Sequence, residues 1–461
     1  MNFLSLSFAG FGLCVFAAFW GLSRRFRPYV LALANLGFAF LFGWQGLAVL
    51  LGVTLWGFAA GRWCHKHPKP LILSLSVGIL VALLCSYKYL PLSGGMFSSL
   101  VAPVGLSFYT FKSISYLVQC YQGRQTPVSA LNYWNYLSFF PQLSSGPIQP
   151  ADQLLGQLTS LQQGFSSTLA YQGCIRLCWG MFLKKCLADP FAAHMGALTD
   201  PEHYYGISIV WATISYGLFL YFDFASYSQL SIGISNLLGF KVEENFLSPY
   251  FSKSIGEFWR RWHISLSRFL REYIYFPLGG SRHGTTRLIL ASLVTFLVSG
   301  IWHGATSGFV VWGLLHGVYI LVQRIWNHCT AGWKLRTSWL YGLASWAVTM
   351  LAVFVGWFFF ATGTVEQAGI LAAYLFQPAP FSLQYLKESL ALLGYTSQVM
   401  LQLGVFSLLA FGVDWCSRKE GFGAFAASLP TAGKVALCYV CLFACLFFGA
   451  SGTLPNVYFA F

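Results

Sequence analysis

Long, uninterrupted apolar runs dominate the hydrophobic pattern of this chain. Several reach or exceed the roughly 20 residues that a helix needs to cross the hydrocarbon core of a bilayer. The longest of these apolar stretches are Tyr29–Gly61, Tyr205–Gly239, Leu288–Trp326 and Val435–Leu454. Each of the first three is long enough for two helices, or for one helix and a re-entrant piece. The pattern predicts an all-α, polytopic membrane protein with about 10–13 membrane or re-entrant helices.

The first apolar run, Phe3–Leu22, is followed by three arginines between residues 24 and 27. It lacks a small-residue cleavage site, so we expect a retained helix rather than a signal peptide. Lys and Arg near helix ends favour the cytoplasmic face. A second basic group lies between residues 62 and 69. The stretch between the two groups is long enough to cross the membrane twice, out and back. Both groups are therefore predicted to be cytoplasmic, with the N-terminus on the periplasmic side.

Composition supports a membrane location. The chain is 57% hydrophobic and only 9% charged, with a mean hydropathy of +0.62, whereas soluble domains carry about 25% charged residues. No hydrophilic block is long enough for a soluble domain, and the alternating strands of a barrel are absent from the sequence pattern. We expect one membrane domain over residues 1–461. The net charge of +14 indicates contact with anionic lipid or an anionic cofactor; nucleic-acid binding is disfavoured because no compact basic domain is present.

The 12 cysteines are scattered, mostly within apolar runs. Cys438 and Cys441 have the Cys-x-x-Cys spacing, with Cys445 one turn further on, but no histidine or acid lies near them in the sequence. We interpret them as small packing residues and predict no metal site.

Between Lys253 and Arg287 the apolar pattern gives way to charged residues mixed with aromatic ones. The charges recur at helical spacing, which predicts an amphipathic helix at an interface or in a protein-lined cavity. Pro277–Gly280 then predicts a turn. A cytoplasmic loop held on lipid headgroups is the alternative. The arginines that could bind the phosphates of a cytosolic cofactor are Arg260, Arg261, Arg268 and Arg271.

Two histidines are candidates for catalysis. His263 lies in the charged region, and His303 lies in the acid-free run Leu288–Trp326. Ionisable groups inside a membrane are costly and often functional, and a neutral imidazole can act as a general base. Three glycines at residues 300, 304 and 308 leave room for a neighbouring helix or for a substrate. The alternative is a helix-packing histidine, and for His316 this alternative is favoured.

Two isolated charges in apolar runs need partners. Asp223 is the only acid in Tyr205–Gly239, and it is predicted to orient a histidine or to pair with an arginine. Lys112 is similarly isolated between Val101 and Tyr121. For this lysine, a polar partner or snorkelling is favoured over nucleophilic work.

An ordered set of motifs between Pro103 and Gly317 resembles the membrane-bound O-acyltransferase family, and most resembles its bacterial branch typified by the alginate O-acetylation membrane protein. The motifs are Pro103–Phe111, Phe139–Ile148, Tyr221–Ser228, Glu244–Phe246, Ser248–Tyr250, Ser254–Ser267, Tyr275–Gly280 and Trp302–Ala305. The resemblance implies helices around a central tunnel, with His303 as the family's essential histidine and His263 as the second, near the cytosolic mouth. Gln119 and Gln229 replace acids expected in the alginate branch, and Ser144-Ser145 is closer to the D-alanylation branch.

The resemblance also implies a reaction. Acetyl from cytosolic acetyl-CoA would cross the bacterial inner membrane for O-acetylation of a polysaccharide of the alginate, peptidoglycan or cellulose type, through a periplasmic SGNH-type transferase. Tyr458, in a C-terminal Tyr-Phe-x-Phe sequence, is a candidate acyl carrier, since a phenol of pKa about 10 leaves more readily than a sugar hydroxyl. An interfacial aromatic anchor is the alternative. Lipid or protein O-acylation, D-alanylation and a non-catalytic export scaffold remain as other functions.

Overall fold

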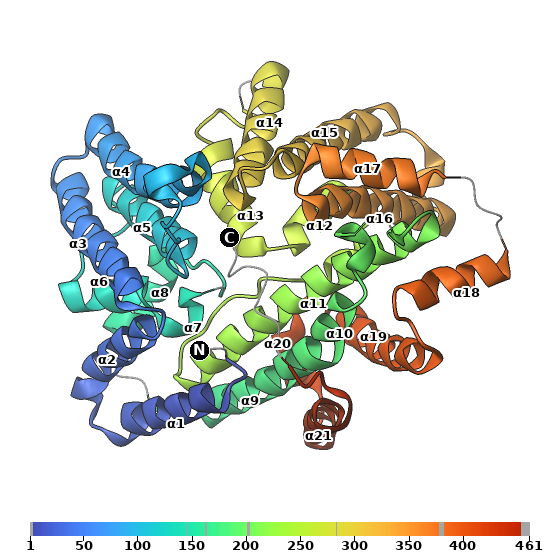
Figure 1. Ribbon diagram of the computed structural model, residues 1–461. Helices are drawn as coiled ribbons and strands as arrows, with labels where there is room; N and C mark the ends of the chain where they lie inside the picture. The colour runs from blue at the N-terminus through green and yellow to red at the C-terminus, as the bar shows by residue number, and fades with distance from the viewer. Residues whose placement is uncertain are drawn as a thin grey trace. The chain divides into compact units, whose positions relative to one another are not determined.

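The computed structural model describes residues 3–144, 146–161, 164–200, 203–282, 284–377 and 382–452. Every regular element in these ranges is helical (Figure 1). The chain forms two compact units: among the described residues, unit 1 comprises 3–178 and 227–243, and unit 2 comprises 179–226 and 244–452. The single domain expected over residues 1–461 stays a prediction.

The helices of unit 1 are α1 (Leu6–Gly21), α2 (Arg27–Phe40), α3 (Trp44–Lys66), α4 (Pro70–Tyr89), α5 (Leu106–Tyr121), α6 (Ala130–Leu137), α7 (Phe140–Leu143), α8 (Ala151–Thr159) and most of α9 (Ser167–Phe182). In Figure 1, α3, α4 and α5 lie side by side. Two glycines allow this approach, because a Cβ at Gly61 would lie 2.3 Å from the Tyr116 ring and one at Gly57 would lie 2.5 Å from the Ser113 hydroxyl. Small residues of this kind let membrane helices pack closely.

Unit 2 carries the remaining helices. They are α10 (Asp189–Ala192), most of α11 (Ile207–Leu237), α12 (Ile255–Arg261), α13 (Ile264–Leu270), α14 (Gly284–His303), α15 (Ser307–Cys329), α16 (Trp339–Thr362), α17 (Val365–Leu375), α18 (Leu383–Leu392), α19 (Ser397–Ser417), α20 (Phe422–Ser428) and α21 (Thr431–Phe448). Helices α14 and α15 form a tight antiparallel pair. At their crossing a Cβ on Gly300 would lie 2.3 Å from the Phe309 carbonyl oxygen, and one on Gly313 would lie 2.4 Å from the Phe296 carbonyl oxygen.

Eight helices among the described residues are long and apolar enough to cross a membrane, which confirms the polytopic helical prediction. The runs Tyr29–Gly61 and Leu288–Trp326 each form two helices, as their lengths allowed. The run Tyr205–Gly239 does not: it forms one helix, α11, of 31 residues. No proline interrupts α11, so nothing in its sequence ends the helix early. The predicted total of about 10–13 includes shorter or re-entrant helices and stays a prediction.

Candidate active site

His263 lies at a break in the charged region. The predicted single amphipathic helix is wrong, because α12 ends at Arg261 and α13 starts at Ile264. His263 itself takes the left-handed conformation, with φ of 41°. Asn245 stabilises the break: its backbone carbonyl accepts from the Ile264 amide at 2.9 Å, and its side-chain oxygen accepts from the Ser265 amide at 3.2 Å. These bonds satisfy amides at the start of α13 that have no partner within the helix.

The same side-chain oxygen of Asn245 lies 3.2 Å from Nδ1 of His263. A backbone amide can only donate, so the Asn245 atom that accepts from Ser265 is the oxygen, and Nδ1 of His263 is the donor. The neutral ring therefore carries its proton on Nδ1, which leaves the lone pair on Nε2. The ring is 1% exposed and meets the Phe224 ring edge to face, with centroids 4.6 Å apart.

Burial lowers the pKa of His263 to about 3, because removing an imidazolium from water is unfavourable. The ring is therefore neutral at physiological pH. A neutral ring protonated on Nδ1 can accept a proton at Nε2, but it has no Nε2 proton to donate to a developing oxyanion.

His303 is the last residue of α14 and is 5% exposed. Its ring lies in an aromatic surround, with centroids 5.1 Å from Trp312, 5.0 Å from Phe360 and 4.5 Å from Trp302. Aromatic walls of this kind keep water away from the ring.

The glycines around His303 serve helix packing. Cβ atoms at Gly300 and Gly304 would lie 2.3 Å and 2.4 Å from atoms of Phe309, and one at Gly308 would lie 2.5 Å from the backbone of Gly363. Of the two readings that the sequence left open, the structure favours a neighbouring helix, since the space beside each glycine is filled by protein.

Both candidate histidines belong to unit 2, and aromatic rings join their surroundings. Trp262 precedes His263 and lies 4.9 Å from Trp357 between centroids; Trp357 lies 5.7 Å from Phe360, which contacts His303. We call Trp262, Trp312, Trp357 and Phe360 the aromatic cluster. It packs rigid side chains between the break at His263 and the end of α14.

His316, a third histidine, also contacts this cluster. It is fully buried and lies 5.1 Å from Trp312 between ring centroids. The Trp259 indole N–H donates to its Nδ1 at 3.2 Å, so α12 is tied to α15 through this ring. The packing role that the sequence favoured fits these contacts.

Asp223 is also buried in unit 2, where it pairs with a lysine. Its Oδ1 lies 2.6 Å from Nζ of Lys184, and the same ammonium lies 2.8 Å from Oδ1 of Asp189. Lys184 stands beside Lys185 in the sequence, yet it is not a surface cation, because its side chain is fully buried. A π-helical segment, Leu183–Ala188, carries this lysine. Since Phe224 follows Asp223 and packs on His263, the ion group fixes the turn of α11 that supports this histidine.

Comparisons with known proteins agree with the motifs. The membrane-bound O-acyltransferase family profile matches residues 68–362, well over half of the chain. The chain belongs to the membrane-bound O-acyltransferase family. It is 32% identical to the probable alginate O-acetylase of Pseudomonas putida over 415 residues, which cover 84% of this chain and 83% of the relative. It is 31% identical to the peptidoglycan O-acetyltransferase of Helicobacter pylori over 73% of this chain and 71% of the relative.

A teichoic acid D-alanyltransferase of Bacillus subtilis is a more distant relative. It is 27% identical over 61% of this chain and 70% of its own length. The comparisons therefore support an acyltransferase, and they include relatives of both the acetyl and the D-alanyl type.

The four arginines predicted to bind a cofactor differ in how exposed their side chains are and in whether protein groups already bind them. Arg260 and Arg271 are exposed, whereas Arg261 and Arg268 are half-buried. The Arg261 guanidinium donates to the carbonyls of Leu247 and Arg418 at 2.9 Å and 3.0 Å. It also pairs with a neighbouring glutamate on α12. Arg261 therefore stabilises the fold, whereas Arg260 and Arg271 are exposed and remain candidates for phosphate binding.

Other predicted residues lie in unit 1 or outside the described ranges. Lys112 has the polar partner expected of it, because its Nζ donates to Gln142 at 3.4 Å and lies 4.8 Å from the Tyr136 ring centroid. Gln229, where an acid was expected, accepts a hydrogen bond from Arg176. Tyr458 lies outside the described residues. Among the described residues, no group of three or more His, Cys, Asp or Glu side chains is arranged to hold a metal ion.

Proposed function

We propose that this chain is a membrane O-acetyltransferase. It takes acetyl from cytosolic acetyl-CoA and passes it across the bacterial inner membrane for O-acetylation of an envelope or extracellular polysaccharide. The polysaccharide is of the alginate, peptidoglycan or cellulose type, and a periplasmic SGNH-type transferase completes the transfer. The relatives named for alginate and peptidoglycan O-acetylation support the acetyl group and the acceptor class.

The aromatic surround of His303 is the observation that carries the proposal. A histidine that is 5% exposed among Trp302, Trp312 and Phe360 can bind a hydroxyl proton while water is kept away. Water would otherwise hydrolyse an acyl thioester. The sequence motif around His303, Trp302–Ala305, is also one of the motifs through which the chain resembles its family.

In the proposed reaction, His303 accepts the proton of the acceptor hydroxyl as the oxygen attacks the acyl carbon of the thioester. The carbon–oxygen bond forms, the carbon–sulfur bond breaks, and the imidazolium of His303 returns the proton to the sulfur. General-base catalysis of this kind contributes about 10²–10⁴-fold to a rate.

His263 is proposed to have a supporting role in this reaction. With its proton on Nδ1, bound to Asn245, the ring accepts rather than donates at Nε2. We therefore propose that it orients a donor group of the substrate, and that donors other than this histidine stabilise the oxyanion.

The exposed guanidinium groups of Arg260 and Arg271 fit the phosphates of acetyl-CoA, because guanidinium groups bind phosphate oxygens through paired hydrogen bonds. Arg260 lies in α12 and Arg271 directly follows α13, so the proposed donor site is at these two helices. The N-terminus is proposed to be periplasmic, from the basic groups that follow α1 and α3.

Inside-out membrane vesicles that contain the full chain and its periplasmic partner test this proposal. With radiolabelled acetyl-CoA added outside, label should accumulate on polysaccharide within the vesicles. Label found on a lipid or a protein instead would support the alternative of lipid or protein O-acylation, and polysaccharide labelling that survives His303→Ala would support a non-catalytic scaffold.

Tyr458 is proposed as the acyl carrier between the two sides. Mass spectrometry of the C-terminal peptide after incubation with labelled acetyl-CoA should find acetyl on this tyrosine. A transfer-competent protein with no label there would exclude the carrier role.

A further inference from the structure

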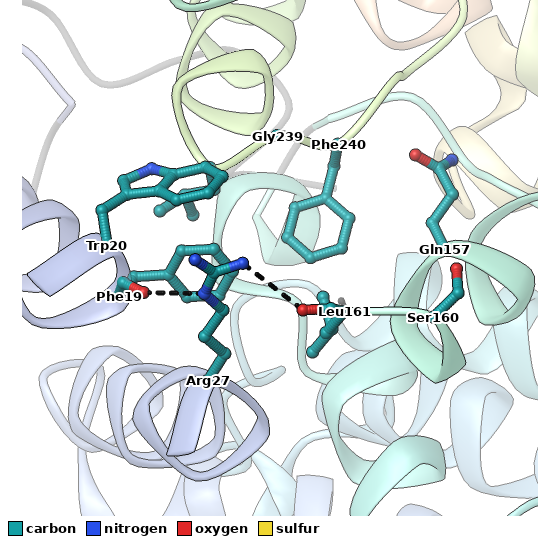
Figure 2. A pocket seen from close by; sticks show the side chains of 9 residues that line it. Phe19, Trp20, Arg27, Gln157, Ser160, Leu161, Gly239 and Phe240 are labelled. Carbon is teal, nitrogen blue, oxygen red and sulfur yellow. Dashed lines mark hydrogen bonds between the residues drawn. The ribbon is translucent and has the colours of Figure 1, made fainter. Parts of the chain in front are cut away.

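The small pocket at the end of α1 in unit 1 is closed by contacts within the protein. Figure 2 shows the Arg27 side chain beside the Phe19 and Trp20 rings. Its Nε donates to the Phe19 carbonyl at 3.1 Å, and its Nη1 donates to the Leu161 carbonyl at 3.4 Å. Arg27 thus joins the start of α2 to the end of α1 and to the chain just after α8, which is a packing role.

Unit 2 brings two thiols together from distant parts of the chain. Cys186 lies in the π-helical segment Leu183–Ala188, and Cys445 lies in α21. Their sulfur atoms are 4.0 Å apart, although 259 residues separate them in the sequence. Because the sulfurs of a disulfide are about 2.05 Å apart, the two atoms need to approach by roughly 2 Å, which rotation of the two short side chains supplies.

The backbones that carry these cysteines are already held in contact. The amide of Ala450, just beyond α21, donates to the carbonyl of Lys185 at 3.0 Å. On the other side, the carbonyl of Phe448 accepts from the side chain of Gln402 in α19, at 3.1 Å. Both α19 and α21 contact the π-helical segment. A bond between the thiols therefore requires no new approach of the two segments.

The two thiols differ in exposure, as an attacking thiol and a resolving thiol do. Cys186 is fully buried, whereas Cys445 is half-buried and lies one turn before the end of α21. Reactivity toward an external disulfide depends on access to the attacking sulfur. Cys445 is therefore the thiol that an oxidant meets first, and Cys186 lies next to it.

The end of α21 that carries Cys445 is predicted to be periplasmic. Both α19 and α21 are long and apolar enough to cross a membrane. Arg418 and Lys419 follow α19, Lys434 lies in the first turn of α21, and no Lys or Arg follows Lys434 in the sequence. Since cations gather on the cytosolic side, α21 runs from the cytosol to the periplasm, a compartment in which disulfides persist.

We propose that Cys186 and Cys445 form a disulfide, made by a periplasmic thiol–disulfide oxidant; the periplasmic setting rests on the inner-membrane location in the proposed function. The Cys445 thiolate attacks the oxidant's disulfide, which forms a mixed disulfide and releases one oxidant sulfur. The Cys186 thiolate then attacks the Cys445 sulfur and releases the second oxidant sulfur. The two thiol protons and two electrons pass to the oxidant, which is reduced from a disulfide to a dithiol.

The bond would fix a helix that packs weakly. The buried residues of α21 are Cys441 and Ala444, so few of its side chains hold it to unit 2. A disulfide across a long loop stabilises the folded state by restricting the unfolded chain. Cys186 also lies two residues from Lys184, so the bond would tie α21 to the segment that carries the buried ion group.

Peptide mapping of the full chain in membranes prepared without reductant tests the proposal. The sample is quenched in acid, free thiols are blocked with N-ethylmaleimide, and the peptides are analysed by mass spectrometry before and after dithiothreitol. A peptide pair that joins Cys186 to Cys445 should be present in most molecules and should separate on reduction. Maleimide on both cysteines, or a bond from either of them to Cys441 instead, would overturn the proposal. Because acetyl transfer is not measured, such a failure leaves the proposed function standing.

Thermal unfolding in detergent gives a second readout with a matched control. Dithiothreitol should lower the melting temperature of the wild type by about 2 °C or more. Cys445→Ala should abolish this effect of the reductant. Cys438→Ala removes another half-buried cysteine of α21 and should retain the effect. A wild type that is insensitive to reductant, or a Cys445→Ala protein that stays sensitive, would contradict the proposed bond.

Discussion

Nδ1 of His263 lies 3.2 Å from the side-chain oxygen of Asn245, which also accepts from the amide and the hydroxyl of Ser265. This one amide oxygen thus accepts hydrogen bonds at the start of α13 and also determines which nitrogen of the His263 ring carries the proton. Asn245→Asp keeps the shape and adds a negative charge. Because an opposite charge favours the imidazolium, we expect the pKa of His263 to rise from about 3.

In this variant the lone pair on Nε2 is lost as the pH falls through the raised pKa. The acid limb of the pH–rate profile for acetyl transfer should therefore move to higher pH than in the wild type. Asn245→Ala, which adds no charge, should lower stability by about 1–3 kcal/mol, from buried donors left without an acceptor, with no such shift. Coincident acid limbs for Asn245→Asp and the wild type would show that His263 takes no part in the reaction.

The low pKa of His263 also predicts how stability depends on pH. In the unfolded chain a histidine titrates near ~6.5, whereas in the folded protein His263 titrates at about 3. Between these values the unfolded state binds a proton that the folded state does not, so stability falls as the pH drops below ~6.5 and is independent of this group above it. Thermal unfolding in detergent between pH 7.5 and 5 should show a weaker pH dependence for His263→Gln than for the wild type. Identical dependences would mean that the ring is solvated.

Lys184 is shared by two buried carboxylates, those of Asp189 and Asp223. Lys184→Met removes this cation and should destabilise the protein by about 3–5 kcal/mol, the usual cost of breaking a buried ion pair. Adding Asp223→Asn removes one of the two negative charges, so the double variant should be more stable than the sum of the single effects predicts. Thermal unfolding of the four proteins in the double-mutant cycle measures this coupling. Strict additivity would contradict the proposed sharing.

The crossing of α14 and α15 depends on glycines that bring their backbones together. Gly313→Ala would place a Cβ 2.4 Å from the Phe296 carbonyl oxygen, and we expect a cost of about 1–3 kcal/mol from overpacking. Transfer activity should fall as well, since His303 lies at the end of α14. Gly412→Ala on α19 is the control, because a Cβ there meets nothing within 4 Å, and it should leave the melting temperature unchanged or slightly raised.

Helices that lie within long apolar runs could be predicted from the sequence. Leu288–Trp326 gave α14 and α15 because its length exceeds one membrane crossing. The single helix of Tyr205–Gly239 was not predicted, since length alone does not say whether a run turns back. The break at His263 was missed for another reason: its left-handed backbone is held by Asn245, 18 residues away in sequence, and local periodicity carries no trace of that contact.

For the candidate site, the sequence could identify the charged residues whose burial in a membrane is energetically unfavourable, but it could not identify their partners. Asp223 was recognised as an acid that needs a counter-charge, yet Lys184 stands beside Lys185 in the sequence and resembles a surface cation. The π-helical segment around Lys184 turns it inward, and Asp189 completes the group. Similarly, the sequence suggested that Arg261 binds phosphate. Its guanidinium is instead bonded to the carbonyls of Leu247 and Arg418, and these bonds form only in the folded chain.

His303 as the general base is the central claim, and the rate of labelled acetyl transfer in vesicles tests it most directly. His194→Ala serves as the matched control, because His194 is also buried in unit 2 but bonds to the Leu393 carbonyl, away from the aromatic cluster. We predict that His303→Ala lowers the rate by about 10²-fold or more while the protein keeps its folded state, and that His194→Ala retains transfer. A His303→Ala protein that transfers acetyl at the wild-type rate would contradict the account.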